Sequence, residues 1–285
     1  MKKILITGAG SYIGTSFENY LKNFGDEYSV DTVDMIDGSW KEKSFSGYDA
    51  VFHVAGIAHD TGNKKDADLY YRVNRDLAIE TAEKAKTDGV KQFVFMSSML
   101  VYNGCKDRNI TSETQPRVKG CYGDSKLQAD LALQRMNSDE FCVSVLRPPM
   151  IYGKNCKGNF PRLIGLAEKL PFFPDVKNRR SMLYVGNLCE FIRVIVDRKI
   201  GGVLFPQNSE YVCTTELVRA AMTALGKKKR FTRIFNPLIA LAKPIVGSVN
   251  KMFGNLTYDK SMSVYDFNYN VADFQKSIEE SVGRL

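Results

Sequence analysis

Residues 2–18, KKILITGAGSYIGTSFE, constrain the fold of this chain more than any other stretch. They begin with a short apolar run at residues 4–6, which is typical of a buried parallel strand. Glycines interrupt the run within residues 7–10, and apolar side chains then recur at helical spacing over residues 11–23. A strand, a glycine turn and a helix N-terminus together form an anion site, because the first helical N–H groups lack partners and the dipole favours negative charge.

An acidic residue at the end of the next apolar run indicates which anionic ligand this turn binds. Residues 30–34 are predicted to form the second strand, with Asp34 at its carboxyl end. A carboxylate there accepts hydrogen bonds from the adenosine ribose of NAD and repels the 2′-phosphate of NADP. The alternative is a tight loop that binds nothing. The position of the loop after the first strand, together with Asp34, favours an NAD site.

Strands and helices alternate over the following hundred or so residues. Strands are predicted at 49–56, 92–96 and 141–146, and helices at 70–86 and 122–136. This alternation predicts an α/β fold with a doubly wound parallel sheet, whose ligands bind at the carboxyl ends of the strands. The small residues Val54, Ala55 and Gly56 would let the backbone pass close to a pyrophosphate. Asn74 is placed to hydrogen-bond backbone from within its helix, and His53 is expected to be a core histidine.

Tyr122 and Lys126 are the candidate catalytic pair. They are four residues apart in a predicted helix and therefore share one face. An ammonium near a phenol lowers the tyrosine pKa toward neutrality, so the tyrosine can exchange a proton with a substrate alcohol during hydride transfer. Ser98, at the end of the preceding strand, can bridge the substrate oxygen and the tyrosine. A Tyr-x-x-x-Lys alone usually marks an exposed helix face, but its position after the glycine turn and the acidic and serine strand ends favours catalysis.

Composition argues against a nucleic-acid-binding protein and against a metal site. The 285 residues suffice for one large α/β domain or for a cofactor domain with a second lobe. The net charge of +8 suits an anionic small ligand, and no nucleic-acid recognition motif accompanies it. Six scattered cysteines without a Cys-x-x-Cys pair, and only two histidines, His53 and His59, argue against a metal site. We expect reduced thiols in a cytoplasmic protein.

The sequence predicts neither a targeting signal nor a transmembrane helix. The N-terminus enters a strand directly, so we expect no signal peptide. No apolar run reaches the roughly 18 to 20 residues that a transmembrane helix needs. Residues 234–253 are apolar but are interrupted by prolines and lysines. A partner surface or a pair of core helices is favoured there over contact with a membrane face.

These motifs resemble those of the extended short-chain dehydrogenases/reductases of the NAD-dependent epimerase/dehydratase group. The resemblance implies a Rossmann-type NAD-binding domain at residues 1–153. A small substrate-binding lobe would follow at 154–285, from which residues 182–206 or so return to the Rossmann sheet. It also implies a homodimer formed by the helix from Tyr70 and the helix that carries Tyr122. The residues that carry the resemblance are residues 7–14, Asp34, Val54-Ala55-Gly56, Asn74, Ser97-Ser98, Tyr122 with Lys126, and Arg147-Pro148.

The predicted cofactor contacts follow from these motifs. They are Gly8, Gly10, Ser11, Tyr12, Ile13, Gly14, Asp34, Val54, Ala55, Gly56, Asn74, Ser97, Tyr122 and Lys126. One position departs from the pattern Thr-Gly-x-x-Gly-x-x-Gly that is usual in this group. The pattern has glycine at position 11, where this chain has Ser11 preceded by Gly10, so the residue that replaces the middle glycine stays open.

The second half is similar to UDP-N-acetylhexosamine 4-keto reductases of bacterial surface-polysaccharide synthesis, at residues 147–153, 158–160 and 253–256. By this resemblance Asn159 touches the diphosphate or the sugar, and Arg180 pairs with the diphosphate, where its guanidinium fork suits phosphate oxygens. The 4,6-dehydratases of the group carry an Asp-Glu pair directly after the serine or threonine. Met99 and Leu100 stand there in this chain, which disfavours dehydration.

Three functions stay open. We favour a UDP-hexose or UDP-N-acetylhexosamine 4-epimerase, because it regenerates bound NAD and Asp34 favours NAD. A reductase that uses NAD(P)H on a UDP-4-keto-6-deoxy-N-acetylhexosamine would need the same residues. A non-catalytic NAD-binding sensor or scaffold is the third possibility, and the intact set of Ser98, Tyr122 and Lys126 argues against it.

Overall fold

The computed structural model describes residues 1–57 and 67–283, and the chain forms two units. Unit 1 comprises Met1–Lys106, Thr114–Pro149 and Leu188–Pro206. Unit 2 comprises Asp107–Glu113, Met150–Asn187 and Gln207–Leu285. The assignment of the cofactor to the first unit and of the substrate to the second stays a prediction. His59 lies outside the described residues.

Unit 1 is built on a six-stranded parallel sheet in the order β10-β6-β4-β3-β1-β2. The strands β2 and β3 lie on opposite sides of β1, so the chain reverses its direction across the sheet at the carboxyl ends of β1 and β3. Such a switch point is where ligands bind in this class of fold. The predicted doubly wound parallel sheet is confirmed. The strands are β1 (Lys2–Thr7), β2 (Tyr28–Val33), β3 (Ala50–His53), β4 (Gln92–Met96), β6 (Cys142–Leu146) and β10 (Gly202–Leu204).

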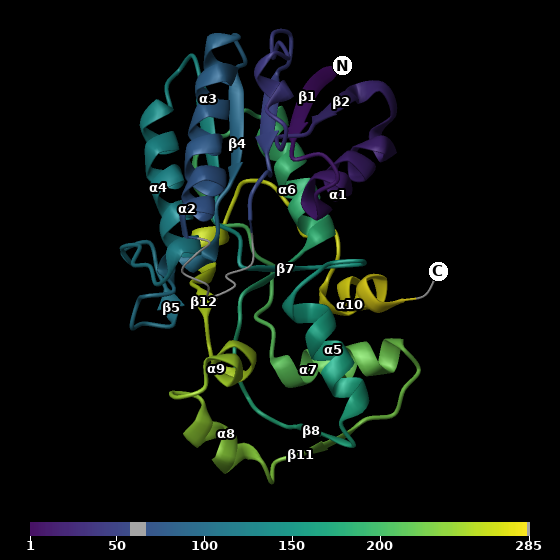
Figure 1. The fold of residues 1–285 in the computed structure, drawn as a ribbon. Coiled ribbons are helices and arrows are strands. Elements are labelled where there is room, and N and C mark those ends of the chain that lie inside the picture. The colour runs from purple at the N-terminus through teal and green to yellow at the C-terminus, as the bar shows by residue number, and fades with distance from the viewer. Residues whose placement is uncertain (58–66, 284–285) are drawn as a thin grey trace. The chain divides into compact units, whose positions relative to one another are not determined.

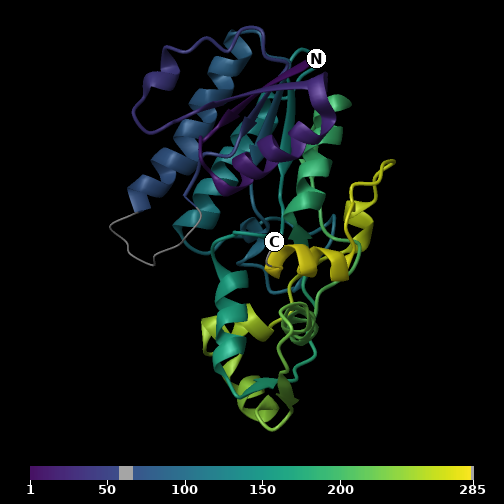
Figure 2. The ribbon, with the colours of Figure 1, turned by 90° about the vertical axis from the view of Figure 1, so that its right-hand side faces the viewer.

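Helices cover both faces of this sheet, with α1 and α6 on one face and α3 and α4 on the other (Figures 1 and 2). They are α1 (Tyr12–Leu21), α2 (Ala67–Tyr70), α3 (Leu77–Thr87), α4 (Cys121–Met136) and α6 (Val185–Asp197). Short 3-10 helices span Lys22–Glu27, Ser39–Lys41 and Met99–Tyr102. The helix predicted at residues 70–86 is not uniform, because a π-helical segment, Tyr71–Asp76, joins α2 to α3. Such wide turns often occur at functional sites, and this one carries Asn74.

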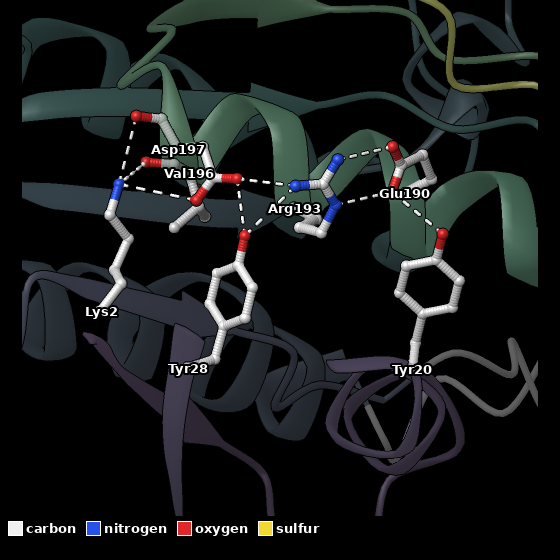
Figure 3. Close-up of polar contacts among 7 residues, drawn as sticks. All are labelled: Lys2, Tyr20, Tyr28, Glu190, Arg193, Val196 and Asp197. Carbon is white, nitrogen blue, oxygen red and sulfur yellow. Dashed lines mark hydrogen bonds and ion pairs between the residues drawn. The ribbon is translucent and has the colours of Figure 1, made fainter. Parts of the chain in front are cut away.

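A polar network fixes α6 against α1 and β2 (Figure 3). Arg193 donates to both carboxylate oxygens of Glu190, at 2.7 and 2.8 Å, and to Asp197 at 2.9 Å. Tyr20 of α1 donates to Glu190, and Tyr28 of β2 donates to Asp197 at 2.6 Å. Burial and the Asp197 carboxylate raise the pKa of Tyr28 to about 12, so this phenol remains a donor at neutral pH. These contacts explain why α6 from Leu188 onward belongs to unit 1, together with the chain up to Pro206.

Unit 2 consists of helices with three two-stranded parallel pairs. Its core includes Tyr152, whose hydroxyl lies 2.6 Å from the Ser277 hydroxyl, and Phe173. The strand β9 pairs with β7 here, so of the stretch 182–206 only β10 joins the sheet of unit 1. The pairs are β5 (Asn109–Ile110) with β12 (Thr257–Tyr258), β7 (Met150–Tyr152) with β9 (Met182–Tyr184), and β8 (Phe172–Pro174) with β11 (Arg230–Thr232). The helices are α5 (Asn159–Lys169), α7 (Thr214–Ala224), α8 (Asn236–Ala242), α9 (Gly247–Phe253), a 3-10 turn at Lys260–Ser263, and α10 (Phe274–Val282).

Of the two alternatives favoured for residues 234–253, a pair of core helices is wrong, and a partner surface stays a prediction. None of the residues of α8 is buried, and in α9 only Phe253 is. Prolines at positions 237 and 244 limit α8 to seven residues, which is too short to pack an apolar stripe along the unit. Among the residues that the structure describes, no helix combines the length and the apolar character needed to cross a membrane.

Candidate active site

The register of the sheet in unit 1 brings four predicted motifs to one edge. Thr7 at the end of β1 is level with Val33 at the end of β2 and with His53 at the end of β3. His53 is in turn level with Phe95 near the end of β4. The glycine turn, Asp34, residues 54–56 and residues 97–98 directly follow these strand ends. They therefore lie along the carboxyl edge of the sheet, at its switch point.

Gly8 shows why the turn after β1 needs glycine. Its φ of +87° is in the left-handed region, and a Cβ on it would lie 2.9 Å from the backbone nitrogen of Ala55. The Gly8 N–H donates to the carbonyl of Val33 at 2.9 Å, and the Ala9 N–H shares that acceptor. The turn is thus held between the ends of β2 and β3, and a side chain is excluded both by conformation and by space.

The structure also answers which residue replaces the missing middle glycine. Ser11 is the N-cap of α1, with φ at −67°, and its hydroxyl accepts the Gly14 N–H at 3.3 Å. Gly10 takes the left-handed conformation instead, with φ at +72°. A serine is therefore unstrained at position 11, where φ is negative and the hydroxyl caps the helix, and Gly10 supplies a left-handed residue of the turn. Tyr12, Ile13 and Gly14 form the first turn of the helix.

Asp34 directly follows β2 and is exposed at the same edge. One of its carboxylate oxygens accepts the N–H of Ile36 at 2.9 Å. This bond initiates a turn, so the side chain has a local structural role. The carboxylate is exposed beside the glycine turn, and its contact with a ribose stays a prediction.

Lys126 lies on α4, one turn after Tyr122, and is almost fully buried. Its ammonium donates to the carbonyl of Met96 at 2.9 Å and lies 4.8 Å from the centre of the Phe95 ring. Burial lowers the pKa of Lys126 to about 8, and the charge of Asp130 opposes that shift. This lysine is therefore poised to lose or gain a proton close to neutral pH.

Tyr122 adjoins Ser98, but its acidity differs from the expectation. Burial raises the pKa of Tyr122, and a hydrogen bond with the Ser98 side chain acts in the opposite direction. The pKa of Tyr122 is therefore shifted in the direction opposite to the one expected from Lys126. The reason is that burial dominates while the ammonium is held by the Met96 carbonyl. Ser98 also caps the Met99–Tyr102 turn by accepting the Leu100 N–H at 3.1 Å.

Asn74 positions the loop that follows β3. Its side chain is fully buried, accepts the Ile57 N–H at 2.8 Å, and donates to the Ile57 carbonyl at 3.1 Å and to Ser125 at 3.3 Å. A Cβ on Gly56 would lie 3.0 Å from the Asn74 amide oxygen and 3.1 Å from the Lys126 ammonium. Asn74 and Lys126 therefore close around Gly56, so a larger residue there would require these side chains to shift.

The two predicted substrate residues belong to unit 2. Arg180 donates to the Gly254 carbonyl at 3.1 Å, and its buried Nε has no hydrogen-bond partner within residues 1–57 and 67–283. Burial lowers the pKa of this guanidinium. A buried cation without a matching charge is costly, and it therefore fits an anionic ligand. Asn159 is the first residue of α5 and is exposed.

Comparison with known proteins decides the family. The sequence model of the NAD dependent epimerase/dehydratase family matches residues 4–204, which is more than half of the chain. The chain belongs to this family. It is therefore an NAD-dependent enzyme, and the predicted enzyme class and NAD cofactor are confirmed at that level.

Members of the family that act on sugars are among its relatives. This chain is 28% identical to the UDP-glucose 4-epimerase of Vibrio cholerae, over 79% of this chain and 76% of that enzyme. It is 27% identical to the N-acetyl-alpha-D-glucosaminyl-diphospho-ditrans,octacis-undecaprenol 4-epimerase of Escherichia coli O157:H7, over 67% of this chain and 62% of that enzyme. The fold matches the dTDP-4-dehydrorhamnose reductase of Yersinia enterocolitica with a TM-score of 0.74 at 18% identity, over 99% of each chain. A nucleotide-sugar epimerase or reductase is thus supported.

The edge of unit 1 fits the cofactor of the family. Gly8 permits close backbone approach, the start of α1 offers N–H groups and a positive dipole end, and Asp34 is exposed beside them. We find no arrangement of three or more His, Cys, Asp or Glu side chains that could hold a metal ion in the described part of the chain. His53 is fully buried, its Nδ1 lies 2.9 Å from the Thr7 hydroxyl, and burial lowers its pKa to about 3. It is a neutral core histidine, as predicted.

Sequence analysis missed a buried network that includes Asp130 of α4. Arg147 donates to both oxygens of Asp130 at 2.8 Å and to the Tyr102 hydroxyl at 2.6 Å. Ser97 donates to Asp130 at 2.6 Å, so its side chain is engaged here, and its predicted contact with the cofactor stays a prediction. Asp130 is completely buried and follows Lys126 by four residues on α4. The spacing of Tyr122, Lys126 and Asp130 on one helix face was the signal that could have revealed it.

Proposed function

We propose that this enzyme is a nucleotide-sugar 4-epimerase that acts on a UDP-hexose or a UDP-N-acetylhexosamine. The observation that carries the proposal is the meeting of Ser98 and Tyr122 at the carboxyl edge of the sheet, one helical turn from the buried Lys126. An acid/base phenol at the switch point suits the oxidation of a secondary alcohol. A protein that only binds NAD would not require Ser98, Tyr122 and Lys126 together.

The reaction is a reversible proton and hydride transfer at C4. Tyr122 acts in its phenolate form, which the positive charge of a protonated Lys126 favours. The phenolate takes the proton of the C4 hydroxyl, and Ser98 hydrogen-bonds the same sugar oxygen. Bound NAD would supply the acceptor and donor of the C4 hydride. Rotation of the 4-keto sugar would present its other face, and Tyr122 would give the proton back to the C4 oxygen, so no electrons are gained or lost overall. Lys126 holds positive charge near the site when its amine is protonated.

The glycine turn and α1 would hold the cofactor. The N–H groups at the start of α1, with Gly8, Gly10 and Ser11, suit the pyrophosphate, and Asp34 suits the adenosine ribose. Residues 54–56 would lie along the pyrophosphate, held in place by Asn74. A carboxylate at this ribose position selects NAD over NADP.

Arg180 supports a diphosphate substrate. Its buried guanidinium lacks a matching anion within the described residues, and a fork of N–H donors suits two phosphate oxygens. Asn159 at the start of α5 would contact the diphosphate or the sugar. Met99 is buried and Leu100 is apolar, so neither supplies the acid and base that dehydration requires. The diphosphate can also be carried by a polyprenyl lipid, as the name of the E. coli relative states, so the substrate panel should include both carriers.

The decisive experiment incubates the purified protein, without added cofactor, with UDP-glucose and UDP-N-acetylglucosamine. We expect conversion to the C4 epimer with no net change in NADH absorbance. Oxidation of NAD(P)H by a UDP-4-keto-6-deoxy sugar, with no epimerisation, would overturn the proposal in favour of a reductase. No reaction in either assay, with NAD bound, would favour a sensor or scaffold.

A pair of variants tests the assigned acid/base. Tyr122→Phe should lower turnover by about 10²- to 10⁴-fold, the usual contribution of such a group, while NAD still binds. Tyr71→Phe is the matched control, because it also removes one phenol hydroxyl, which donates to Asp124 at 2.7 Å. Its turnover should stay near that of the unmodified enzyme. Equal activity in the two variants would exclude Tyr122 as the acid/base.

A further inference from the structure

The net charge of the chain is concentrated in one segment. Residues 217–258 contain eight lysines and arginines and no aspartate or glutamate. The remaining sequence balances 32 basic against 32 acidic residues, so these 42 residues account for the whole formal charge of +8. They include β11, α8, α9 and β12 of unit 2. A segment so depleted in acidic groups is an electrostatic footprint for an anionic partner.

Apolar side chains are exposed within the same segment. Ile234, Leu238, Leu241 and Ile245 are 82%, 66%, 71% and 83% exposed. Leu238 and Leu241 lie three residues apart in α8 and share one face of it, whereas Ile234 lies just before the helix and Ile245 just after it. Since α8 buries none of its residues, these apolar side chains remain largely in solvent. Exposed apolar residues that cluster in this way mark an interaction site.

Uncompensated basic residues accompany these apolar side chains. Lys228, Arg230, Lys243 and Lys251 form no ion pair within residues 1–57 and 67–283, whereas Lys227 pairs with Glu168 and Arg233 with Asp175. Arg230 begins β11, level with the exposed Phe172 of β8. Figure 1 shows α8 and the β8–β11 pair at one end of unit 2. We call this set of apolar and unpaired basic residues, 228–251, the apolar–basic surface.

We propose that the apolar–basic surface docks on an anionic lipid bilayer. The apolar side chains of α8 would enter the boundary between headgroups and acyl chains, and the lysines would remain at the level of the phosphates. Each basic residue near an anionic leaflet strengthens binding by about five-fold. A protein partner fits less well, because the cores of protein–protein interfaces are depleted in lysine.

Co-sedimentation of the full chain with lipid vesicles tests the proposal. We expect binding to vesicles of phosphatidylglycerol and phosphatidylcholine, little binding to phosphatidylcholine alone, and weakening by salt, because salt screens the attraction. Docking is separate from the proposed reaction, which is assayed on soluble substrates. A chain that epimerises UDP-sugars but binds no vesicles would overturn only the docking proposal.

Two sets of variants separate the apolar from the basic contribution. Replacement of Leu238, Leu241 and Ile245 by Gln should weaken vesicle binding at least about ten-fold, whereas Ile36→Gln with Val264→Gln, also exposed apolar positions, should not. Replacement of Lys228, Lys243 and Lys251 by Gln should weaken binding to the anionic vesicles by about 10²-fold. The matched control replaces the exposed Lys91, Lys106 and Lys154 by Gln and should leave binding unchanged.

A fluorescent probe reports on docking without loss of a contact. Trp40 is the only tryptophan and is buried in unit 1, so Leu241→Trp adds a signal from α8. We expect its emission to shift to the blue when anionic vesicles are added, and Val264→Trp to show no shift. Equal binding by the basic variant and its control would refute the electrostatic argument. A dimer that becomes a monomer in the Leu238, Leu241 and Ile245 variant, with no vesicle binding, would show a protein interface instead.

Discussion

Replacing Lys126 by methionine should abolish catalysis and yet stabilise the protein without ligands at neutral pH. The side chain is almost fully buried, and its ammonium donates to the carbonyl of Met96 at 2.9 Å. Methionine has a similar length and no charge, so it should occupy the same space beside Phe95. The variant no longer buries a charge in an apolar site, which raises its free energy of unfolding. The free energy of the lost hydrogen bond must be subtracted from this gain.

The magnitude follows from the pKa of Lys126. Burial lowers it from 10.5 to about 8, a shift worth about 3.4 kcal/mol at about 1.36 kcal/mol per unit. A hydrogen bond from a charged donor offsets about 1.5–3 kcal/mol of this. The Lys126→Met variant should therefore be about 1 kcal/mol more stable at pH 7.

The difference in stability between Lys126→Met and the unmodified protein should change sign as the pH rises. Below pH 8 the folded and the unfolded chain both carry the proton on Lys126, so the full cost of the buried charge is present. Between pH 8 and 10.5 the folded chain has lost that proton while the unfolded chain keeps it. The stability of the unmodified protein therefore rises with pH relative to the variant, by up to about 1.4 kcal/mol per pH unit.

Urea unfolding from pH 7 to pH 10, on protein freed of NAD, measures this difference. The matched control is Lys91→Met, at an exposed lysine, which should show no pH-dependent difference. The pKa of Lys260 is also lowered to about 8 by burial, but this group is present in all three proteins and its effect cancels. Parallel stability curves for the unmodified protein and Lys126→Met would refute the reasoning.

Three further predictions concern the surroundings of the catalytic helix. Asp130→Leu should lower the free energy of unfolding in urea by about 3–5 kcal/mol, because it leaves the buried Arg147 without its carboxylate; a loss below about 1 kcal/mol would contradict this. Gly56→Ala should weaken NAD binding, measured by calorimetry, because its Cβ would lie 3.0 Å from Asn74; unchanged affinity would show that the loop can yield. We propose a homodimer through the helices near Tyr70 and Tyr122, so Leu131→Asp, at an exposed position of α4, should give a monomer by light scattering, and an unchanged mass would exclude α4 from the interface.

Some of the site was predictable because its signals are local. The apolar run, glycines and helical spacing of residues 2–18 specify a strand, a turn and a helix start without reference to the rest of the chain. The same holds for Asp34 at a strand end and for Tyr122 and Lys126 on one helix face. Parallel pairing then follows from the alternation of strands and helices, which is why the carboxyl edge could be assembled from the sequence.

Patterns along the sequence do not show which side chains are buried or which distant residues they contact. Tertiary structure decides both. The partner of Lys126 is a carbonyl 30 residues earlier, so burial and not the ammonium controls the pKa of Tyr122. Asp130 meets Arg147 only because α4 packs beside the ends of β4 and β6. For the apolar residues around α8 the sequence left a core helix or a partner surface open, and in the structure they remain exposed. The sequence thus determined the sheet, the glycine turn and the catalytic helix through local periodicity, whereas packing decided which charges are buried and which apolar side chains face solvent.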